Sequence, residues 1–270
     1  MIRPIRLVVS DVDGTLVRSD KTLSDGTIAA VKRLQDAGIP LSLISARPPS
    51  GMLWIAERLG LTGLIAAFNG GTIVQTDGTV VSAERLALDV AKQALALIDD
   101  PAIIVWVFAN GCWHTSKLDV AHTASERKSA NQEPIVCSDF SGLLGQIDKI
   151  VAVSDDHAML AKLEAQVAGA LGDGATVIRS QLYYLDITAP RANKGDGIAA
   201  LAKAAGVDLA QVVAIGDQRN DLAMFARAGL SIAMAQGPED VRMAADQVTS
   251  SNDDDGVALA IDRIIMPELG

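Results

Sequence analysis

Short apolar runs alternate with longer amphipathic stretches through the first third of the chain. Apolar runs of a few residues predict buried strands, and apolar residues recurring every three or four positions predict helices. The predicted strands are Leu7–Ser10, Leu41–Ser45 and Leu64–Phe68, and the predicted helices between them are Ser24–Ala37 and Pro49–Leu59. This order is typical of a parallel sheet with helices on its faces.

The pattern changes in the middle of the chain, where hairpins predominate. The pairs Asp77-Gly78 and Asn110-Gly111 lie between predicted strands, and Asn-Gly is a strong signal for a type I′ turn. The stretch Asp119–Glu133 is polar and carries no predicted element. The predicted elements are hairpins over Ile73–Val81 and Ile103–Ser116, helices Leu86–Ile98 and His157–Leu171, and strands Lys149–Val153, Thr176–Arg179 and Tyr183–Thr188. Hairpins mixed with two helices predict an α+β unit with an antiparallel sheet.

From Asn193 onward the first rhythm returns. The predicted elements are helix Gly195–Ala205, strand Val212–Ile215, helix Asp221–Arg227, strand Ser231–Met234 and helix Pro238–Ala244. A chain of 270 residues exceeds one typical domain. The simplest arrangement is a discontinuous, Rossmann-like α/β core with a parallel sheet, residues 1–81 and 189–270, that carries an inserted α+β cap domain at 82–188.

Composition narrows the choice of partners. The formal charge of −10 and the pI near 4.7 argue against a nucleic-acid partner, because nucleic-acid phosphates are bound by clustered lysine and arginine. An acidic protein that handles phosphates needs local positive charge, most simply a bound cation with one or two basic residues. The hydrophobic fraction of 49% with only 3% aromatic residues predicts a core of aliphatic side chains.

The cysteines and the terminal sequence indicate a compartment. Cys112 and Cys137 are the two cysteines, with no metal-ligand spacing around them, so a disulfide framework or zinc site is not expected and a reducing compartment is. No signal-peptide pattern follows Met1, and no run of about 18 apolar residues occurs. We therefore expect a cytoplasmic protein with no membrane partner. The oligomeric state is not indicated.

The strongest chemical signal is the stretch Asp11-Val12-Asp13-Gly14-Thr15-Leu16, directly after the first predicted strand. Two carboxylates two residues apart can hold a divalent cation and still leave one carboxylate free to attack phosphorus. Asp and Gly are also ordinary turn residues, so the motif gains weight only from its place between a strand and a helix.

Two further groups lie where a phosphate could bind. Ser45-Ala46-Arg47 follows the second strand, where a hydroxyl and backbone N–H groups at a helix start can hold phosphoryl oxygens; a plain helix-entry turn is the alternative. Lys194 opens the helix after the insertion, a position that the helix dipole disfavours for a cation. An anion facing Lys194 would explain it, and a surface lysine is the alternative.

A second acidic cluster, Gly216-Asp217-Gln218-Arg219-Asn220-Asp221, follows the strand Val212–Ile215. Ligands of open α/β sheets bind outside the carboxyl ends of the strands. Carboxylates of Asp11 and Asp217 from adjacent strand ends would suit Mg²⁺, which prefers hard oxygen ligands. Alternatively, Asp217 and Asn220 cap the helix that begins near Asp221.

In their order and spacing, DVDGTL, SAR, NKG and GDQRND resemble the four signatures of the haloacid dehalogenase superfamily of phosphotransferases. Phe68-Asn69-Gly70-Gly71 and the closing stretch SIAMAQGPEDVRMAADQVTSSNDDDGV are similar to its Cof-like branch, whose members carry a large α/β cap between the second and third motifs. The resemblance covers both core segments nearly end to end, whereas the cap matches in layout.

The resemblance implies a magnesium-dependent phosphatase of small phosphorylated metabolites, such as a sugar phosphate or a cofactor or nucleotide phosphate, that works through an aspartyl-phosphate. It implies that Asp11 is the nucleophile and Asp13 the general acid/base. Mg²⁺ would be held by the Asp11 carboxylate, the Asp13 backbone carbonyl and the Asp217 carboxylate. The phosphoryl oxygens would be bound by Ser45, Lys194 and Asn220. Thr15 would support the Asp11 loop, and Asp221 would orient the metal site or Lys194.

Alternatives stay open within and beyond this family. A phosphomutase shares the same core, and a phosphate-binding regulatory module could have kept the fold without turnover. Ala46 stands where the branch commonly has glycine, so the second-motif loop is expected to use an ordinary backbone conformation. The substrate is not indicated. Candidate contacts to the leaving group are Arg47, Trp113 and Tyr184, with Asp186 on the same strand face as Tyr184; Trp113 and Tyr184 could equally belong to the cap core.

Overall fold

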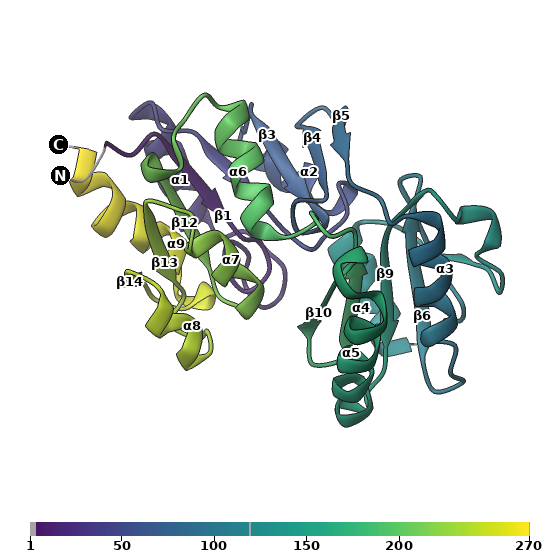
Figure 1. Ribbon diagram of the computed structural model, residues 1–270. Coiled ribbons are helices and arrows are strands. Elements are labelled where there is room, and N and C mark those ends of the chain that lie inside the picture. The colour runs from purple at the N-terminus through teal and green to yellow at the C-terminus, as the bar shows by residue number, and fades with distance from the viewer. Residues whose placement is uncertain (1–3, 119, 270) are drawn as a thin grey trace.

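The computed structural model describes residues 4–118 and 120–269, which form two lobes (Figure 1). The first lobe is built on a five-stranded parallel sheet of order β14-β13-β12-β1-β2. Its strands are β1 (Leu7–Ser10), β2 (Leu41–Leu43), β12 (Val212–Gly216), β13 (Leu230–Ala233) and β14 (Gln247–Val248). The pairing of β1 with β12 joins the two ends of the chain. The predicted Rossmann-like parallel-sheet core is confirmed.

The third predicted strand departs from the parallel pattern. β3 (Leu64–Ala67) touches β2 through a parallel bridge between Ile44 and Ala66, but its own ladder is antiparallel, with β4 (Thr72–Gln75). β4 pairs in turn with β5 (Val80–Ala83). Because β5 continues to Ala83, we propose that the chain leaves the core after residue 83 and not at residue 81.

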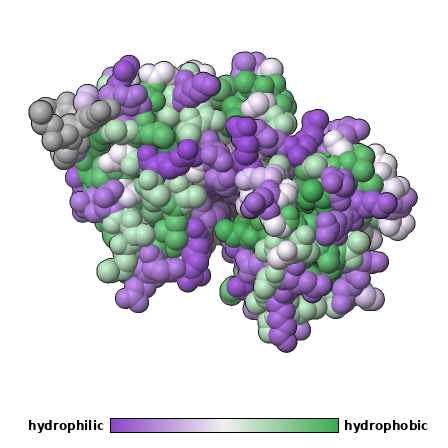
Figure 2. All heavy atoms as spheres, viewed as in Figure 1, coloured by the Kyte–Doolittle hydropathy of each residue, from purple (hydrophilic) through white to green (hydrophobic). Residues whose placement is uncertain are grey.

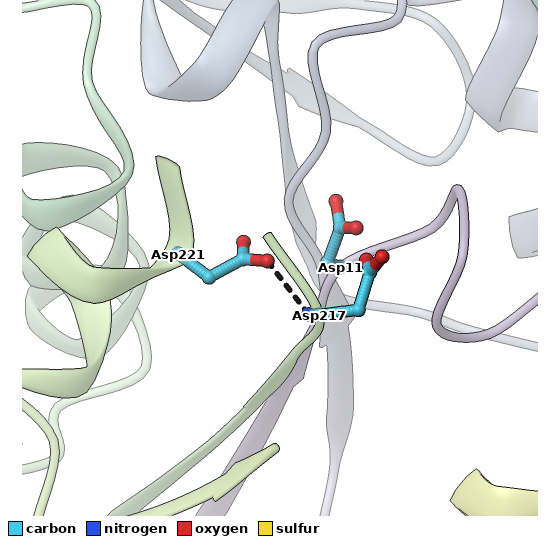
Figure 3. Close-up of side chains that lie close together, drawn as sticks. All are labelled: Asp11, Asp217 and Asp221. Atoms are coloured by element: carbon cyan, nitrogen blue, oxygen red, sulfur yellow. Dashed lines mark hydrogen bonds between the residues drawn. The ribbon is translucent and has the colours of Figure 1, made fainter. Parts of the chain in front are cut away.

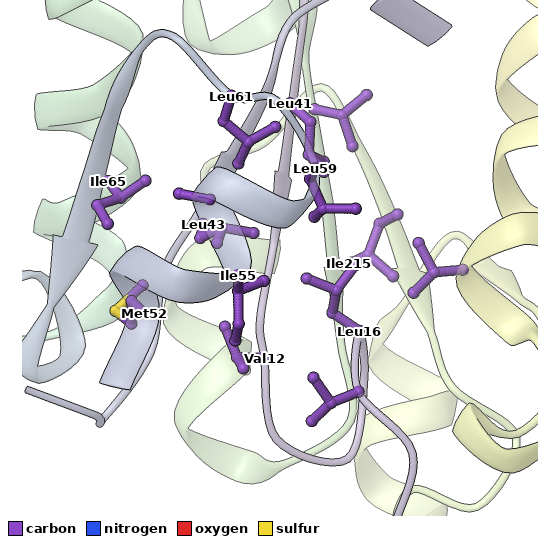
Figure 4. Packing of buried hydrophobic residues seen from close by; sticks show 14 of the residues in the cluster. Val12, Leu16, Leu41, Leu43, Met52, Ile55, Leu59, Leu61, Ile65 and Ile215 are labelled. Carbon is purple, nitrogen blue, oxygen red and sulfur yellow. The ribbon is translucent and has the colours of Figure 1, made fainter. Parts of the chain in front are cut away.

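Successive side chains of a strand point to opposite faces of the sheet, and here apolar side chains lie on both faces. Helices therefore cover both faces of the parallel sheet. The helices are α1 (Asp25–Asp36), α2 (Ser50–Arg58), α6 (Lys194–Ala204), α7 (Leu222–Phe225), α8 (Glu239–Ala244) and α9 (Gly256–Ala260). Leu43 and Ile215 pack with Ile55 of α2 on the face that α1, α2 and α9 cover (Figure 4). Val9 and Ala214 point to the opposite face, toward α6 and α7.

The second lobe is a six-stranded sheet of order β10-β11-β9-β6-β7-β8. Its strands are β6 (Ile104–Ala109), β7 (Cys112–Thr115), β8 (Ile135–Val136), β9 (Ile147–Val153), β10 (Thr176–Gln181) and β11 (Tyr184–Thr188). All pairings are antiparallel except that of β7 with β8. Asn110 and Gly111 have φ of 54° and 74°, as a type I′ turn requires. The predicted antiparallel α+β unit is confirmed.

Two helices of this lobe, α3 (Leu88–Leu97) and α5 (His157–Leu171), agree with the prediction and pack on one face of the sheet. A third helix, α4 (Val120–Ala130), forms where the sequence predicts only a polar stretch, whose first residue, Asp119, lies outside the described residues. The buried positions of α4 include Thr123, Glu126 and Ala130. Their spacing is helical, but two of the three are polar, so hydrophobic periodicity gives no signal.

The start of α2 meets the end of α4, which joins the two lobes. The Ser50 hydroxyl donates to the Ala130 carbonyl at 2.6 Å. A Cβ atom at Gly51 would lie 2.0 Å from the Ser129 carbonyl oxygen, so this contact requires glycine. Polar and apolar residues are interspersed on the face seen in Figure 2, which is hollowed between the lobes. Within the described part of the chain, no helix is long and apolar enough to cross a membrane.

Candidate active site

A cavity of about 130 Å³ lies between the lobes, at the carboxyl ends of the core strands. Asp11 follows β1 directly, Ser45 lies just beyond β2, and Asp217 follows β12. Because β1 lies between β2 and β12 in the sheet, these three side chains come together, as expected for the ligand-binding edge of an open α/β sheet.

The Asp11 carboxylate is buried against Lys194. Lys194 Nζ lies 2.6 Å from Asp11 Oδ1 and 2.5 Å from Asp221 Oδ1, and the lysine is 2% exposed. Burial alone would lower the pKa of Lys194, but the charges of Asp11 and Asp221 raise it above its ordinary value. The structure therefore places Lys194 at the site as a charged ammonium group, at the first turn of α6, where Asn193 supplies the helix cap.

The Asp217 carboxylate is held by the loop of the first motif. Thr15 Oγ1 donates to Asp217 Oδ1 at 3.0 Å, and Gln218 Nε2 donates to Oδ2 at 3.1 Å. Gly14 has φ of 79°, and a Cβ atom there would lie 2.5 Å from Asp217 Oδ2. Glycine is thus needed at this position both for the turn and for the close approach of the two loops.

Asp221 orients its neighbours instead of facing the cavity. Its Oδ1 accepts from Lys194, and its Oδ2 accepts from the backbone N–H groups of Asp217 and Gln218, each at 2.8 Å. Figure 3 shows the Asp221 side chain reaching to the Asp217 backbone, while the side chains of Asp11 and Asp217 lie next to one another. The alternative that Asp217 caps the helix is not seen; the capping box here joins Gln218 and Asp221.

The three carboxylates carry more negative charge than their surroundings offset. One oxygen each from Asp11, Asp217 and Asp221 lie within 4.8 Å of one another, and among the described residues Lys194 is the only base paired with this group. Three carboxylates and one ammonium leave a formal charge of −2. Burial and the nearby Asp221 raise the pKa of Asp217 to about 6. Buried hard oxygens with excess negative charge fit a divalent cation such as Mg²⁺.

Asp13 has the opposite environment. Arg47 donates to both of its oxygens, at 2.6 and 2.8 Å, and Lys21 Nζ donates to Oδ1 at 2.6 Å. Burial alone would raise the pKa of Asp13, but the hydrogen bonds and charges of Arg47 and Lys21 hold it below its ordinary value. Asp13 is therefore ionised. Arg47 is itself buried and also donates to the Gly51 carbonyl at 3.0 Å.

The remaining predicted phosphate ligands line the same cavity. Ser45 Oγ accepts from the Arg47 N–H at 3.2 Å, and Ala46 does not have a positive φ, which confirms the expected ordinary backbone of this loop. Asn220 also lines the cavity. Its side chain lies 3.4 Å from that of Asn69, which is held at φ of 58° in the loop after β3.

The cap contributes one wall of the cavity. Of the two predicted cap contacts, Tyr184 lines the cavity, but Trp113 does not. Trp113 is fully buried, with its ring 5.1 Å from that of Trp106 and stacked on Phe108 at 6.2 Å. Of the two alternatives for Trp113, the structure therefore favours a place in the cap core, because a large ring on an inward strand position packs against apolar neighbours.

Most of the cap residues at the cavity are not among the predicted site residues. The additional lining residues are Lys21, Ala46 and Gln218 of the core and Ser125, Glu126, Ser129, Lys149, Ser180, Gln181 and Tyr183 of the cap. Lys149 has a signal in the sequence, since Lys149 and Asp148 are charged residues inside the strand Ile147–Val153, whose other five residues are apolar. Glu126 has none, because nothing in the sequence pattern predicts the helix that carries it.

A parallel α/β sheet with two acidic loops and a buried lysine at its carboxyl edge places the protein among Rossmann-like proteins with a polar site at the strand ends. Residues 8–261 match the family of haloacid dehalogenase-like hydrolases, and the chain belongs to this family. It is a hydrolase of the phosphatase type, and the predicted membership of the haloacid dehalogenase superfamily is confirmed.

Relatives match over nearly the whole chain. The chain is 30% identical to the HMP-PP phosphatase of Cronobacter sakazakii, over 85% of this chain and 84% of that protein. It is 25% identical to the 5-amino-6-(5-phospho-D-ribitylamino)uracil phosphatase of Bacillus subtilis, over 93% and 94%. A haloacid dehalogenase-like hydrolase from Bacteroides thetaiotaomicron has the same fold, with a TM-score of 0.84 and 29% identity over 96% of this chain and 99% of that structure.

Proposed function

We propose that the protein hydrolyses phosphate monoesters of small metabolites in a magnesium-dependent reaction through an aspartyl-phosphate at Asp11. The observation that carries the proposal is the Asp11 carboxylate, buried at the end of β1 between Lys194 and Asp217. In the first step an Asp11 oxygen attacks phosphorus and the alcohol leaves; in the second, water releases phosphate and restores the carboxylate. Splitting the reaction in this way replaces one difficult displacement with two easier ones.

Asp13 is the proposed general acid/base. Its ionised state, held by Arg47 and Lys21, suits the second step, in which it takes a proton from the attacking water. In the first step the leaving alcohol needs a proton from Asp13. The contacts to Arg47 and Lys21 must therefore loosen when substrate binds, so that this carboxyl can be protonated.

Mg²⁺ would be held by the carboxylates of Asp11 and Asp217 with the backbone carbonyl of Asp13, and would supply charge stabilisation at the transferring phosphoryl group. Thr15 and Asp221 fix Asp217 and Lys194 for this purpose. The Lys194 ammonium, the Ser45 hydroxyl and the Asn220 amide would bind the phosphoryl oxygens. Positioning and electrostatic stabilisation of this kind supply most of the catalysis in phosphoryl transfer.

The substrate class is argued from the relatives and the cavity. Two of the relatives carry the names of their substrates, HMP-PP and 5-amino-6-(5-phospho-D-ribitylamino)uracil, which supports a small phosphorylated metabolite here. We also propose that the protein works in the cytoplasm, because Cys112 and Cys137 are both free thiols, as expected in a reducing compartment.

A release assay tests the proposal. Purified protein should release phosphate from 4-nitrophenyl phosphate, lose this activity with EDTA and regain it with excess Mg²⁺. Phosphate release that survives exhaustive chelation would remove the metal from the mechanism. Binding of phosphate without any turnover on a broad panel would favour the regulatory module instead.

A further inference from the structure

The cap places one unpartnered carboxyl group over the active site. Glu126 of α4 is 8% exposed and lines the cavity that also contains Asp11 and Asp13. No described residue forms a hydrogen bond or ion pair with it. A buried carboxyl without a partner is unfavourable, and polar groups left unpaired in a native structure call for an explanation. A ligand that enters the cavity can supply the missing partner.

A second charged group of the cap lines the same cavity in a fixed position. Lys149 Nζ donates to the Ala46 carbonyl of the core at 3.0 Å and lies 3.6 Å from Asp186 Oδ2. Its ammonium also sits 5.0 Å from the centre of the Phe108 ring. An ammonium group has three N–H donors. The Ala46 carbonyl accepts from one of them, and Asp186 at 3.6 Å is an ion-pair partner beyond hydrogen-bond distance, so two remain for groups in the cavity.

We propose that Glu126 and Lys149 form the leaving-group site of the cap, in which Glu126 accepts a hydrogen bond from one hydroxyl of a polyhydroxylated alcohol and Lys149 donates to another. This inference rests on the phosphatase function proposed above. It assigns the substrate class as small polyol or sugar phosphates, and it assigns two specificity-determining residues that touch the alcohol and not the phosphoryl group.

The rest of the cavity favours the same class. Its other cap residues include Ser125, Ser129 and Ser180, whose hydroxyls suit a hydrogen-bonding alcohol. A second phosphate beside Glu126 would meet negative charge, which Asp186 behind Lys149 increases. The volume of about 130 Å³ is well below the roughly 300 Å³ at which ordinary ligand pockets begin. This arrangement of the lobes therefore favours a small leaving group over a nucleoside.

The test compares substrates and variants in the presence of Mg²⁺. The panel contains pentose, hexose and hexitol phosphates, a nucleoside monophosphate, a diphosphate monoester and 4-nitrophenyl phosphate. The variants are Glu126→Gln, Glu126→Ala and Lys149→Met, with Glu133→Gln and Lys162→Met as controls at cap positions away from the cavity. Thermal melting of each variant shows that it is folded.

We expect the wild-type protein to prefer a polyol or sugar phosphate. The Glu126 and Lys149 variants should lower kcat/KM for that substrate by about 10- to 100-fold, the effect of one charged hydrogen bond. The Glu126 variants should change kcat/KM for 4-nitrophenyl phosphate, whose leaving group has no hydroxyl for them to contact, by less than about 3-fold. Lys149→Met also loses the donation to the Ala46 carbonyl of the core, so for this variant the expected result is a loss that is larger on the preferred substrate than on 4-nitrophenyl phosphate. The two control variants should behave as wild type with both substrates.

Two results overturn the inference alone: equal losses on both substrates in folded variants, and a wild-type preference for the nucleotide or the diphosphate. A third result would overturn the proposed phosphatase function as well. If the wild-type protein turns over no member of the panel with Mg²⁺, the proposed function fails and the inference fails with it. Turnover by wild type therefore separates the two claims.

Discussion

The two walls of the cavity are built on different principles. On the core side, each functional group follows the end of a strand or opens a helix, so the backbone topology fixes it. On the cap side, the groups project from the middle of a helix and of strands. Asp13 in the core has three hydrogen bonds from Arg47 and Lys21, whereas Glu126 in the cap has none from the described residues.

This difference matches what each wall must bind. The phosphoryl group is the same in every substrate, so a wall that serves it can be preorganised, with its side chains already oriented by hydrogen bonds. The alcohol differs between substrates. A wall that discriminates between alcohols has to leave hydrogen-bond donors and acceptors unpaired until the ligand binds. Because these groups are buried, a ligand that does not pair with them leaves them unsatisfied and binds weakly.

The largest effect expected from this comparison is at the nucleophile. Asp11→Asn keeps the size of the side chain but removes the attacking oxygen, so kcat should fall by on the order of 10⁴ or more on every substrate. Steady-state kinetics on the substrate panel measures this, and Asp36→Asn on the exposed end of α1 is the control. Near-normal turnover by Asp11→Asn would contradict the covalent scheme. Asp13→Asn should also be slow, yet trap the phosphoenzyme.

The next effect concerns the lysine that pairs two carboxylates. Lys194→Met leaves Asp11 and Asp221 buried without their cation, which costs about 3–5 kcal/mol of stability when one partner of a buried pair is removed. Turnover should fall about 10²- to 10³-fold on all substrates, because one fixed charge is lost at the phosphoryl group. Denaturant unfolding and kcat/KM report the two effects. Unchanged stability would show that water, not Lys194, satisfies these carboxylates.

The same division explains what the sequence could predict. The strand ends of the core can be located from apolar runs followed by Asp, Gly or Ser, and this pattern alone predicts Asp11 and Asp217 at one edge of the sheet. The turn at Gly14 and the N-terminal position of Lys194 also follow from local chemistry. The pairing of Asp13 with Arg47 could not be predicted, because it depends on the approach of two loops.

The cap was predictable as a fold but not as a site. Its hairpins and two helices follow from turn residues and periodicity, but α4 buries polar residues, so its inner face looks like surface in the sequence. From the sequence, two aromatic residues of the cap sheet were equally good candidates for the cavity wall, Trp113 and Tyr184. Only the three-dimensional packing separates Trp113, buried in the core, from Tyr184, at the cavity wall.

That pair of aromatic residues gives the third prediction. Trp113→Ala should destabilise the protein by about 3–5 kcal/mol, as expected for a large ring removed from a packed core, and leave the rank order of substrates unchanged. Tyr184→Ala should change the rank order. Unfolding in denaturant and kcat/KM across the panel distinguish the two variants. A changed rank order in folded Trp113→Ala would return this residue to the list of substrate contacts.

The smallest expected effect concerns the cap wall alone. It is the change with pH in the contribution of the Glu126 carboxyl to the free energy of unfolding. Burial raises the pKa of Glu126 from 4.5 to about 7; Asp186 and Asp13 add to the rise, and Lys149 and Arg47 oppose it. At a pH between 4.5 and about 7, Glu126 is mostly deprotonated in the unfolded chain but still mostly protonated in the folded protein. Deprotonation therefore favours unfolding, and the contribution of this carboxyl to stability falls as pH rises from about 4.5 to 7.

Glu126→Gln removes the titrating group, so the variant should gain stability relative to wild type as the pH increases from about 5 to about 8. The limit set by the change in pKa is about 3 kcal/mol. Denaturant unfolding at each pH, followed by the fluorescence of Trp106 and Trp113 in the cap, measures the difference. Glu133→Gln, on the surface of the same lobe, should follow wild type. A difference between Glu126→Gln and wild type that does not change with pH would mean that this carboxyl is hydrated in the folded protein and needs no ligand to satisfy it.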